Sequence, residues 1–363
     1  MSLPRRLQTL IVEITQRCNH ACLHCYNVWI SGAEAQPSTY PGGELDKAGM
    51  LTLLAKALDE TGCRHVTLTG GEPLLRQDLP QIVDFLRRRE VMTTVISNGR
   101  LLTEPAVVDL LDRGVDLFEL PLLSHRRQVH DHLSGASGAF DAVLAAMAHL
   151  RVHRGQFVAV FVITRHNLPD LREAIKLAFA FGARGLMLNR FNPGGRGRRQ
   201  HHELLPTADQ MRQALEVAEA AATALKFPIS CSIPIQPCLV DTREYRHLGF
   251  GFCAAGSDRA YYTLDPLGNL RPCNHTPTIL GNLLQESFSE LTARDRMAEF
   301  VSAIPPVCDP CALRQVCQGG CRASAEVCYG SLTAEDPFLQ LNRTRAAPLL
   351  PGQGYRSTSE AEP

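Results

Sequence analysis

Three cysteines stand close together near the start of the chain, in the sequence Cys18-Asn-His-Ala-Cys22-Leu-His-Cys25. Three thiolates on one short loop suit an iron–sulfur cluster, because each thiolate can bind a different iron. A 4Fe–4S cube with only three cysteine ligands keeps one iron open to another molecule. Zinc is the alternative, since His20 or His24 could supply the fourth ligand that a zinc site needs. Spacing alone leaves both kinds of metal site open.

A second motif, Gly70-Gly71-Glu72-Pro73, directly follows a predicted strand. Glycines at the end of a strand let a ligand approach the backbone, and the carboxylate can accept hydrogen bonds from an ammonium group. Ligands of open α/β folds bind at the carboxyl ends of strands, and the cysteine loop follows a strand as well. Alone, this motif could be an ordinary turn between a strand and a helix. The two motifs together predict one binding site.

These two motifs resemble those of the radical S-adenosylmethionine (SAM) superfamily. Its pattern is C-x3-C-x-φ-C, where φ is usually aromatic, followed by a GGE-type motif. His24 takes the φ position here. The resemblance implies that SAM binds the open iron of a 4Fe–4S cluster, and that the cluster ligands are Cys18, Cys22 and Cys25.

The resemblance also implies how SAM is held and used. Gly70, Gly71 and Glu72 would hold its methionyl ammonium group, and the strand that ends in Ser97-Asn98 would place polar groups near it. One electron from the reduced cluster would then cleave SAM to methionine and a 5′-deoxyadenosyl radical, which abstracts a hydrogen atom from the substrate. The expected SAM contacts are His24, Gly70, Gly71, Glu72, Pro73, Ser97 and Asn98.

The fourth predicted strand departs from the family pattern. Relatives often read V-S-L-D-G there, ahead of a His-Asp pair that this chain keeps as His130-Asp131. Here Pro121 replaces the usual Ser. Either Glu119 or Ser124 takes over the contacts to the SAM ribose, or both have structural roles.

The C-terminal half carries a second cysteine pattern. Cys253-x14-Gly268-x4-Cys273 is followed by C-x2-C-x5-C-x3-C over residues 308–321 and by a last cysteine, Cys328. This order resembles the SPASM domain of certain radical SAM enzymes, which carries two auxiliary iron–sulfur clusters. A zinc ribbon is the alternative for residues 308–321.

The SPASM resemblance implies a ligand set for each auxiliary cluster. The distal cluster would be held by Cys308, Cys311, Cys317 and Cys328. The cluster nearer the SAM site would be held by Cys253, Cys273 and Cys321. Asp258 stands where some relatives have a further cysteine, so the fourth ligand of the near cluster is Asp258, Cys231 or Cys238, or one iron stays open. We favour an open or non-cysteine position, although carboxylates bind iron less readily than thiolates do.

The elements that must position these residues alternate between strands and helices along residues 9–191. Such alternation predicts parallel βα units, and about six fit before the pattern changes. The fold class is therefore α/β, as a partial (β/α)6 TIM-like barrel with a C-terminal cysteine-rich SPASM domain. The predicted strands are 9–15, 65–69, 93–97, 117–122, 157–164 and 185–191, and the predicted helices are 46–59, 79–89, 104–112, 139–152, 170–181 and 207–225.

The expected domain organisation follows this pattern. Residues 9–191 form the radical SAM core, 192–227 a Gly/Arg linker and bridging helix, and 228–335 the SPASM domain, whereas 342–363 form a disordered tail.

Composition narrows the partners. Lys+Arg and Asp+Glu both total 37, so a zero net charge gives no reason to expect nucleic acid or an anionic membrane. No apolar run approaches the roughly 18 residues that span a bilayer, and the N-terminus does not read as a signal peptide. Thirteen cysteines in a chain of 363 residues indicate metal or cluster ligands in a reducing cytoplasm.

The resemblance points to an enzyme that modifies a ribosomally made peptide, through a crosslink or related C–H chemistry. Many such relatives begin with a leader-binding domain of roughly 80–100 residues. The first strand here starts near Thr9, so we expect a separate leader-binding protein, with flavodoxin or ferredoxin as external electron donor. Sulfatase maturation is disfavoured, because Asn274 stands where those maturases have a general-base Asp. The alternatives are a tetrapyrrole- or haem-modifying radical SAM enzyme and a non-catalytic zinc-binding scaffold.

Overall fold

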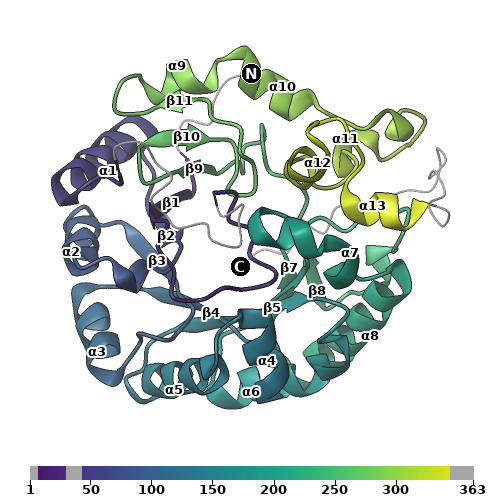
Figure 1. Ribbon diagram of the computed structural model, residues 1–363, viewed down its shortest axis with the longest axis horizontal. Helices are drawn as coiled ribbons and strands as arrows, with labels where there is room; N and C mark the ends of the chain where they lie inside the picture. The colour runs from purple at the N-terminus through teal and green to yellow at the C-terminus, as the bar shows by residue number, and fades with distance from the viewer. Residues whose placement is uncertain (1–6, 30–42, 344–363) are drawn as a thin grey trace.

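One eleven-stranded sheet organises the chain in the computed structural model, which describes residues 7–29 and 43–343. The strand order is β11-β10-β9-β1-β2-β3-β4-β5-β6-β7-β8, and β1 to β8 are parallel to one another. Figure 1 shows these strands curving around a central space, with the helices outside. The predicted α/β fold with a partial barrel is confirmed.

The strands are β1 (Leu10–Thr15), β2 (His65–Gly70), β3 (Met92–Ile96), β4 (Leu117–Pro121), β5 (Phe157–Ile163), β6 (Leu186–Arg190), β7 (Ile229–Cys231), β8 (Leu248–Phe250), β9 (Tyr262–Leu264), β10 (Asn269–Arg271) and β11 (Gly281–Asn282). The α-helices are α1 (Lys47–Thr61), α2 (Leu79–Arg88), α3 (Glu104–Arg113), α4 (Arg127–Ser134), α5 (Ala139–Val152), α6 (Leu171–Phe181), α7 (His201–Leu204), α8 (Ala208–Leu225), α9 (Phe288–Thr292), α10 (Asp295–Ser302), α11 (Arg314–Cys317), α12 (Arg322–Tyr329) and α13 (Pro337–Leu341). Two short 3₁₀ helices also lie near the site, η2 (Pro73–Leu75) and η4 (Gly195–Gln200).

The predicted elements of the first half are present. Each of the six predicted strands agrees with β1 to β6 to within one residue at either end. Helix α4 is an additional element that the sequence pattern did not predict. The sheet also continues beyond β6, because the short strands β7 and β8 extend it in parallel.

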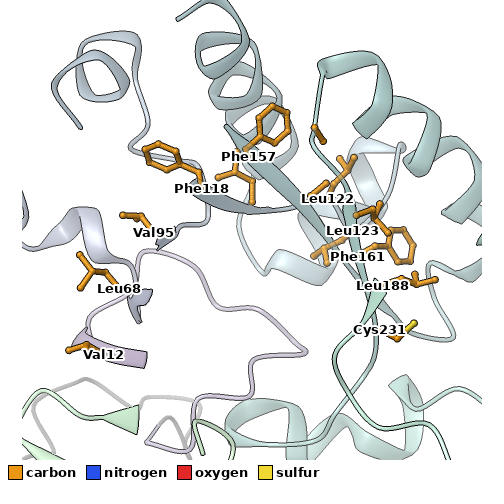
Figure 2. Packing of buried hydrophobic residues seen from close by; sticks show 14 of the residues in the cluster. Val12, Leu68, Val95, Phe118, Leu122, Leu123, Phe157, Phe161, Leu188 and Cys231 are labelled. Carbon is orange, nitrogen blue, oxygen red and sulfur yellow. The ribbon is translucent and has the colours of Figure 1, made fainter. Parts of the chain in front are cut away.

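The main hydrophobic core lies between the strands and the outer helices. Because side chains alternate along a strand, every second residue points outward against the helices. Figure 2 shows such residues on successive strands, and all of them are buried: Val12, Leu68, Val95, Phe118, Phe157, Phe161, Leu188 and Cys231. The alternate, inward-facing residues of β5 and β6 keep partial exposure. The inner face of these strands is therefore more exposed than the outer face, which the helices cover.

The Gly/Arg-rich segment 192–199, which we predicted to be a linker, is packed against the cysteine loop. Gly195 and Gly197 of η4 are buried. The N–H of Gly197 donates to the carbonyl of Cys25 at 2.9 Å. A Cβ atom on Gly195 would lie 2.1 Å from the carbonyl oxygen of Asn27. The glycines are needed here because the backbone of another segment approaches closely. Composition alone does not distinguish such a packed Gly-rich segment from a flexible linker.

The C-terminal region is joined to the barrel by the sheet and by two buried ion pairs. Strands β9 and β10 form an antiparallel hairpin, and β9 pairs in parallel with β1. Glu13 of β1 pairs with Arg271 of β10, and Arg190 of β6 pairs with Asp336, which precedes α13. All four side chains are at most 2% exposed.

Within the described ranges, no single helix is long and apolar enough to cross a membrane. Helices α4 and α5 pass that test only as a pair bent by 101°. Their apolar side chains Leu133, Val143 and Met147 belong to the protein core. The predicted disordered tail lies outside the described residues, apart from its first two positions.

Candidate active site

The loop that leaves β1 carries the three N-terminal cysteines, Cys18, Cys22 and Cys25. The end of helix α4 holds this loop in place. The N–H of Leu23 donates to the carbonyl of Leu133 at 2.9 Å. A Cβ atom on Gly135, which has a φ of 56°, would lie 2.2 Å from the carbonyl oxygen of Ala21. The helix that the sequence pattern missed therefore positions the cysteines, and the Gly at its end was the available signal.

The three thiols suit an iron–sulfur cluster better than a single metal ion. Although Cys18 is exposed as a residue, desolvation of its thiol by the surrounding loop raises its pKa to about 11. Burial and the other two thiols hold the pKa of Cys22 well above its usual value. Three thiolates would therefore need bound cations to stabilise them. Across residues 7–29 and 43–343, no three His, Cys, Asp or Glu side chains are close enough to share one ion. In a 4Fe–4S cube each iron takes one thiolate, so the three thiols need not meet at a single ion.

The two histidines of the loop are neutral. Burial lowers the pKa of both His20 and His24 to about 4. Within the described part of the chain, Nε2 of His20 and Nδ1 of His24 are buried and have no hydrogen-bond partner. His24 therefore has a polar atom available at the family's φ position, and its contact with SAM stays a prediction.

The Gly-Gly turn after β2 is packed against the start of the cysteine loop. The N–H of Gly71 donates to the carbonyl of Thr15 at 2.7 Å. A Cβ atom on Gly70, which has a φ of 123°, would lie 2.1 Å from the same oxygen, and one on Gly71 would lie 2.1 Å from the carbonyl oxygen of Arg17. The close approach that these glycines permit is thus made by the chain's own backbone. It fixes the cysteine loop beside the turn.

Glu72 is fully buried at the end of this turn, just before Pro73 and η2. Its carboxylate accepts hydrogen bonds from the Ser97 hydroxyl at 2.9 Å and from the Asn98 N–H at 2.7 Å. It also accepts one from the N–H of Leu74 at 3.2 Å. Burial nevertheless raises the pKa of Glu72 to about 7. The residues at the end of β3 therefore orient a carboxylate that lacks a cationic partner among the contacts described.

Asn98 completes the connection between the three strand ends. Its side-chain nitrogen lies 2.7 Å from Oδ1 of Asn19 and 4.0 Å from Sγ of Cys18. The structure therefore brings together the predicted cysteine loop, the Gly-Gly-Glu turn and the Ser-Asn end of β3.

The His-Asp pair after β4 has structural partners. Nδ1 of the buried His130 accepts a hydrogen bond from the N–H of Leu123 at 3.2 Å. The Asp131 carboxylate accepts from the N–H groups of Gly138 and Phe140, both at 2.8 Å. Asp131 thus satisfies free donors at the start of α5.

The two residues considered for the SAM ribose are placed differently. The Ser124 hydroxyl donates to Asp170 at 2.6 Å, and Asp170 also pairs with Arg126. Glu119 alternates on β4 with the outward-facing Phe118, so it faces the inside of the barrel. Burial raises the pKa of Glu119 to about 7. Of the two, Glu119 has the placement that suits a ligand contact.

One group of C-terminal cysteines gathers around Tyr261. The thiols of Cys273, Cys253 and Cys321 all contribute to holding the pKa of Tyr261 well above its usual value, with Cys273 as the largest cause. The Tyr261 hydroxyl lies 3.8 Å from Sγ of Cys273. Asn192, which follows β6, donates to Sγ of Cys321 at 3.3 Å. These are the three residues predicted to hold the near auxiliary cluster.

His275 connects this near group to the N-terminal cysteine loop. Its N–H donates to Sγ of Cys273 at 3.3 Å. Its ring centroid lies 4.4 Å from that of Tyr26, the residue after Cys25. Burial lowers the pKa of His275 to about 4, so the ring is neutral. The near group therefore lies beside the N-terminal site.

The remaining cysteines of the SPASM pattern are split. Three of them line one pocket: Cys308, Cys311 and Cys317. Cys328, which the resemblance groups with these three, instead lines a second pocket with Arg198 and Glu326. Burial is the main cause that raises the pKa of Cys328 to about 11, and Cys321 of the near group is the smallest of the contributors.

The other residues considered as fourth ligand of the near cluster are also placed. Asp258 is exposed. Cys231 is buried in the core at the end of β7, and burial alone raises its pKa to about 12. Cys231 therefore has the environment of a structural thiol.

Comparison with known proteins identifies the family. Residues 12–178 match the model of the Radical SAM superfamily. The "PqqA peptide cyclase" of Xanthomonas campestris pv. campestris is 27% identical over 98% of this chain and 90% of its own length. The "AdoMet-dependent heme synthase" of Oleidesulfovibrio alaskensis is 26% identical over 93% of this chain and 90% of its own length.

A solved structure shares the fold. Streptococcus suis SuiB, bound to its precursor peptide SuiA, matches with a TM-score of 0.71, covering 92% of this chain and 75% of that chain at 14% identity. The match over residues 12–178 includes the strand ends that carry the cysteine loop, the Gly-Gly-Glu turn and the Ser-Asn pair. Residues 12–178 therefore form a radical SAM domain, the part of an enzyme that uses SAM and a 4Fe–4S cluster.

Proposed function

We propose that this enzyme modifies a ribosomally made peptide, by forming a crosslink or by related C–H chemistry. The observation that carries this proposal is the similarity to a peptide cyclase, which extends over 98% of this chain and thus beyond the radical SAM core. The fold shared with SuiB, which was solved with a precursor peptide, supports the same class of substrate.

Within this proposal, the chain's own residues hold and orient the cofactor. Glu72, fixed by Ser97 and Asn98, accepts the methionyl ammonium group of SAM. Burial raises the pKa of Glu72 to about 7, and the ammonium group would supply a positive charge that stabilises the ionised carboxylate. When bound, SAM supplies a 5′-deoxyadenosyl radical that takes a hydrogen atom from the substrate. The ligands of the SAM cluster are Cys18, Cys22 and Cys25.

The inner face of the barrel is the proposed place for the peptide. The inward-facing residues Val158, Val160 and Val162 of β5 are half-buried, and so are Met187 and Asn189 of β6. A surface that is largely apolar and still accessible suits a peptide side chain whose C–H bond is to be activated. It also limits the contact of a radical with water and other quenchers.

We further propose that the two C-terminal cysteine groups hold auxiliary iron–sulfur clusters. Closing a crosslink after one hydrogen abstraction requires the substrate radical to lose an electron. The near group, linked to the N-terminal loop through His275 and Tyr26, is placed to accept that electron. The proposed partners are an external donor such as flavodoxin or ferredoxin and a separate protein that binds the peptide leader.

A tetrapyrrole substrate is the second candidate, because a haem synthase is 26% identical over 93% of the chain. Neighbouring genes separate the two candidates in advance. A short precursor open reading frame favours the peptide, and haem-pathway genes favour the tetrapyrrole.

The decisive experiment uses anaerobically reconstituted protein with SAM and a reductant. We expect about twelve irons per chain, with matching sulfide, for three 4Fe–4S clusters. The protein is then mixed with the precursor peptide or with a tetrapyrrole, and 5′-deoxyadenosine and substrate mass are followed. Loss of two hydrogens from the peptide is the expected result. Stimulation of 5′-deoxyadenosine by the tetrapyrrole alone would replace the peptide assignment with the second candidate.

A further inference from the structure

A cysteine outside the SPASM pattern lies with the distal group. The pocket lined by Cys308, Cys311 and Cys317 is also lined by Cys238. Cys238 belongs to the segment between β7 and β8, far from the other three in sequence. The pocket thus has four thiols and is otherwise lined partly by apolar residues such as Leu313 and Leu339.

Buried contacts hold the Cys238 segment against the distal cysteines. Gln236 is fully buried, and its side-chain nitrogen donates to the carbonyl of Gly319 at 3.3 Å. A Cβ atom on Gly320 would lie 2.0 Å from that same nitrogen. The N–H of Leu239 donates back to the carbonyl of Gln236 at 2.9 Å, so residues 236–239 form a turn that carries Cys238. The turn is thereby fixed beside the two glycines that follow Cys317.

The four thiols are near enough to influence one another. Burial raises the pKa of Cys317 to about 12, and Cys238 is the first of the neighbouring thiols that raise it further. Burial raises the pKa of Cys238 to about 11, with additional contributions from Cys308 and Cys311. A Cβ atom on Gly319 would lie 2.5 Å from the ring of Pro305 and 3.4 Å from Sγ of Cys308, so Gly319 lies beside this group of thiols.

Cys328 does not line this pocket; it lies on helix α12 and lines a different pocket. Cys321 caps the start of α12, and Cys328 lies seven residues later on the same helical face. The hydroxyl groups of Thr276 and Thr278 both donate to Glu326, which fixes α12 against the segment that follows Cys273. Cys328 therefore lies outside the pocket that Cys308, Cys311 and Cys317 share with Cys238.

We propose that Cys238 is the fourth cysteine ligand of the distal cluster, in a set with Cys308, Cys311 and Cys317, and that Cys328 is not a ligand of that cluster. The proposal rests on the proposed function, since it takes the auxiliary clusters as present. Four cysteine thiolates are the common ligand set of a 4Fe–4S cluster.

The test begins with the full chain in which the SAM-cluster ligands are removed as Cys18→Ala, Cys22→Ala and Cys25→Ala. All iron that remains after anaerobic reconstitution is then auxiliary. Into this background we introduce Cys238→Ala, Cys328→Ala or Cys231→Ala and measure iron, sulfide and the electron paramagnetic resonance (EPR) spectrum of the reduced protein. Cys231, a core thiol of the same strand–loop region, is the matched control.

We expect Cys238→Ala to lose about four irons per chain and one of the two EPR signals, while Cys328→Ala and Cys231→Ala keep that signal. Cys238→Ser should keep iron but change the g-values, because an oxygen ligand replaces sulfur; this variant distinguishes ligand loss from misfolding. Retention of the unchanged signal in Cys238→Ala, or its loss in Cys328→Ala, would overturn the assignment. If the triple Cys→Ala background protein, still with Cys238, binds no iron, then the auxiliary clusters themselves are absent. This outcome is seen before any change at position 238 and is therefore distinct from failure of the Cys238 assignment.

Discussion

The backbone N–H of Asn98 donates a 2.7 Å hydrogen bond to the buried carboxylate of Glu72. The side chain of the same Asn98 reaches Asn19 and Cys18 on the cysteine loop. One residue therefore couples the orientation of the carboxylate to the position of the loop that carries the SAM-cluster cysteines. A change at Glu72 should consequently affect cofactor binding through both charge and geometry.

Glu72→Gln is expected to weaken SAM binding about 10–100-fold. The amide cannot accept hydrogen bonds on both of its ends, so Ser97 or Asn98 loses an acceptor, at about 1–3 kcal/mol. Equilibrium binding of SAM to the reconstituted enzyme measures the effect, with 5′-deoxyadenosine formation as a second readout. Glu173→Gln, on the exposed face of α6, is the control. Unchanged affinity in Glu72→Gln would show that the carboxylate does not bind the ammonium group.

Gly70→Ala is expected to disrupt the site, because its new Cβ would lie 2.1 Å from the carbonyl oxygen of Thr15. Gly138→Ala is the matched control, since Gly138 also has a positive φ, 74°, but nothing lies within 4 Å of the added Cβ. We expect a cost of about 1 kcal/mol at Gly138 and several times that at Gly70. Anaerobic thermal unfolding and iron content measure the two effects. Equal losses in both variants would contradict the packing role of Gly70.

Much of the fold was predictable because the signals are local. Each parallel strand of the first half is a short apolar run bounded by turn residues, and the chain must return through a helix before the next one. The cysteine loop and the Gly-Gly-Glu turn each follow such a run, which is why their meeting at one end of the sheet could be inferred from the sequence.

The remaining features depend on contacts between distant segments. The composition of the Gly/Arg stretch 192–199 predicts a linker, yet Gly194 and Gly195 pack closely on the backbone of Tyr26 and Asn27. Cys238 joins a pocket with Cys317 only because a turn after β7 packs on the loop before α12. Sequence spacing records neither contact, since both are set by tertiary packing.

Glu119 should make stability depend on pH. Burial raises its pKa from 4.5 to about 7, so between these values the folded chain binds more protons than the unfolded chain. The free energy of unfolding should therefore fall as pH rises through this window. Because the side chain is only half-buried, we expect Glu119→Gln to gain about 1–2 kcal/mol at pH above 7 and nothing at low pH. Thermal unfolding at both ends of the window measures this, and a gain independent of pH would contradict it.

The buried ion pair between Glu13 and Arg271 should be costly to break from one side. Glu13→Gln leaves the fully buried guanidinium without its carboxylate, at about 3–5 kcal/mol. Asp84→Asn removes one of the two carboxylate partners of Arg113, the other being Asp109, in a pair that is about one-third exposed, and should cost much less. Thermal unfolding of the two variants provides the comparison. Similar losses of stability in the two variants would mean that burial does not raise the cost of breaking the pair between Glu13 and Arg271.

Asn192→Ala should lower the reduction potential of the proposed near cluster. Its side-chain nitrogen lies 3.3 Å from Sγ of Cys321, and a hydrogen bond to a ligand sulfur favours the reduced, more negative state. Removing that donor makes reduction harder, whereas the SAM cluster should keep its potential. The control is Asn189→Ala on β6, the strand that precedes Asn192; the Asn189 side chain accepts hydrogen bonds from Ser232. An EPR-monitored redox titration measures both clusters, and equal shifts in the two variants would exclude a specific role for the Asn192 hydrogen bond.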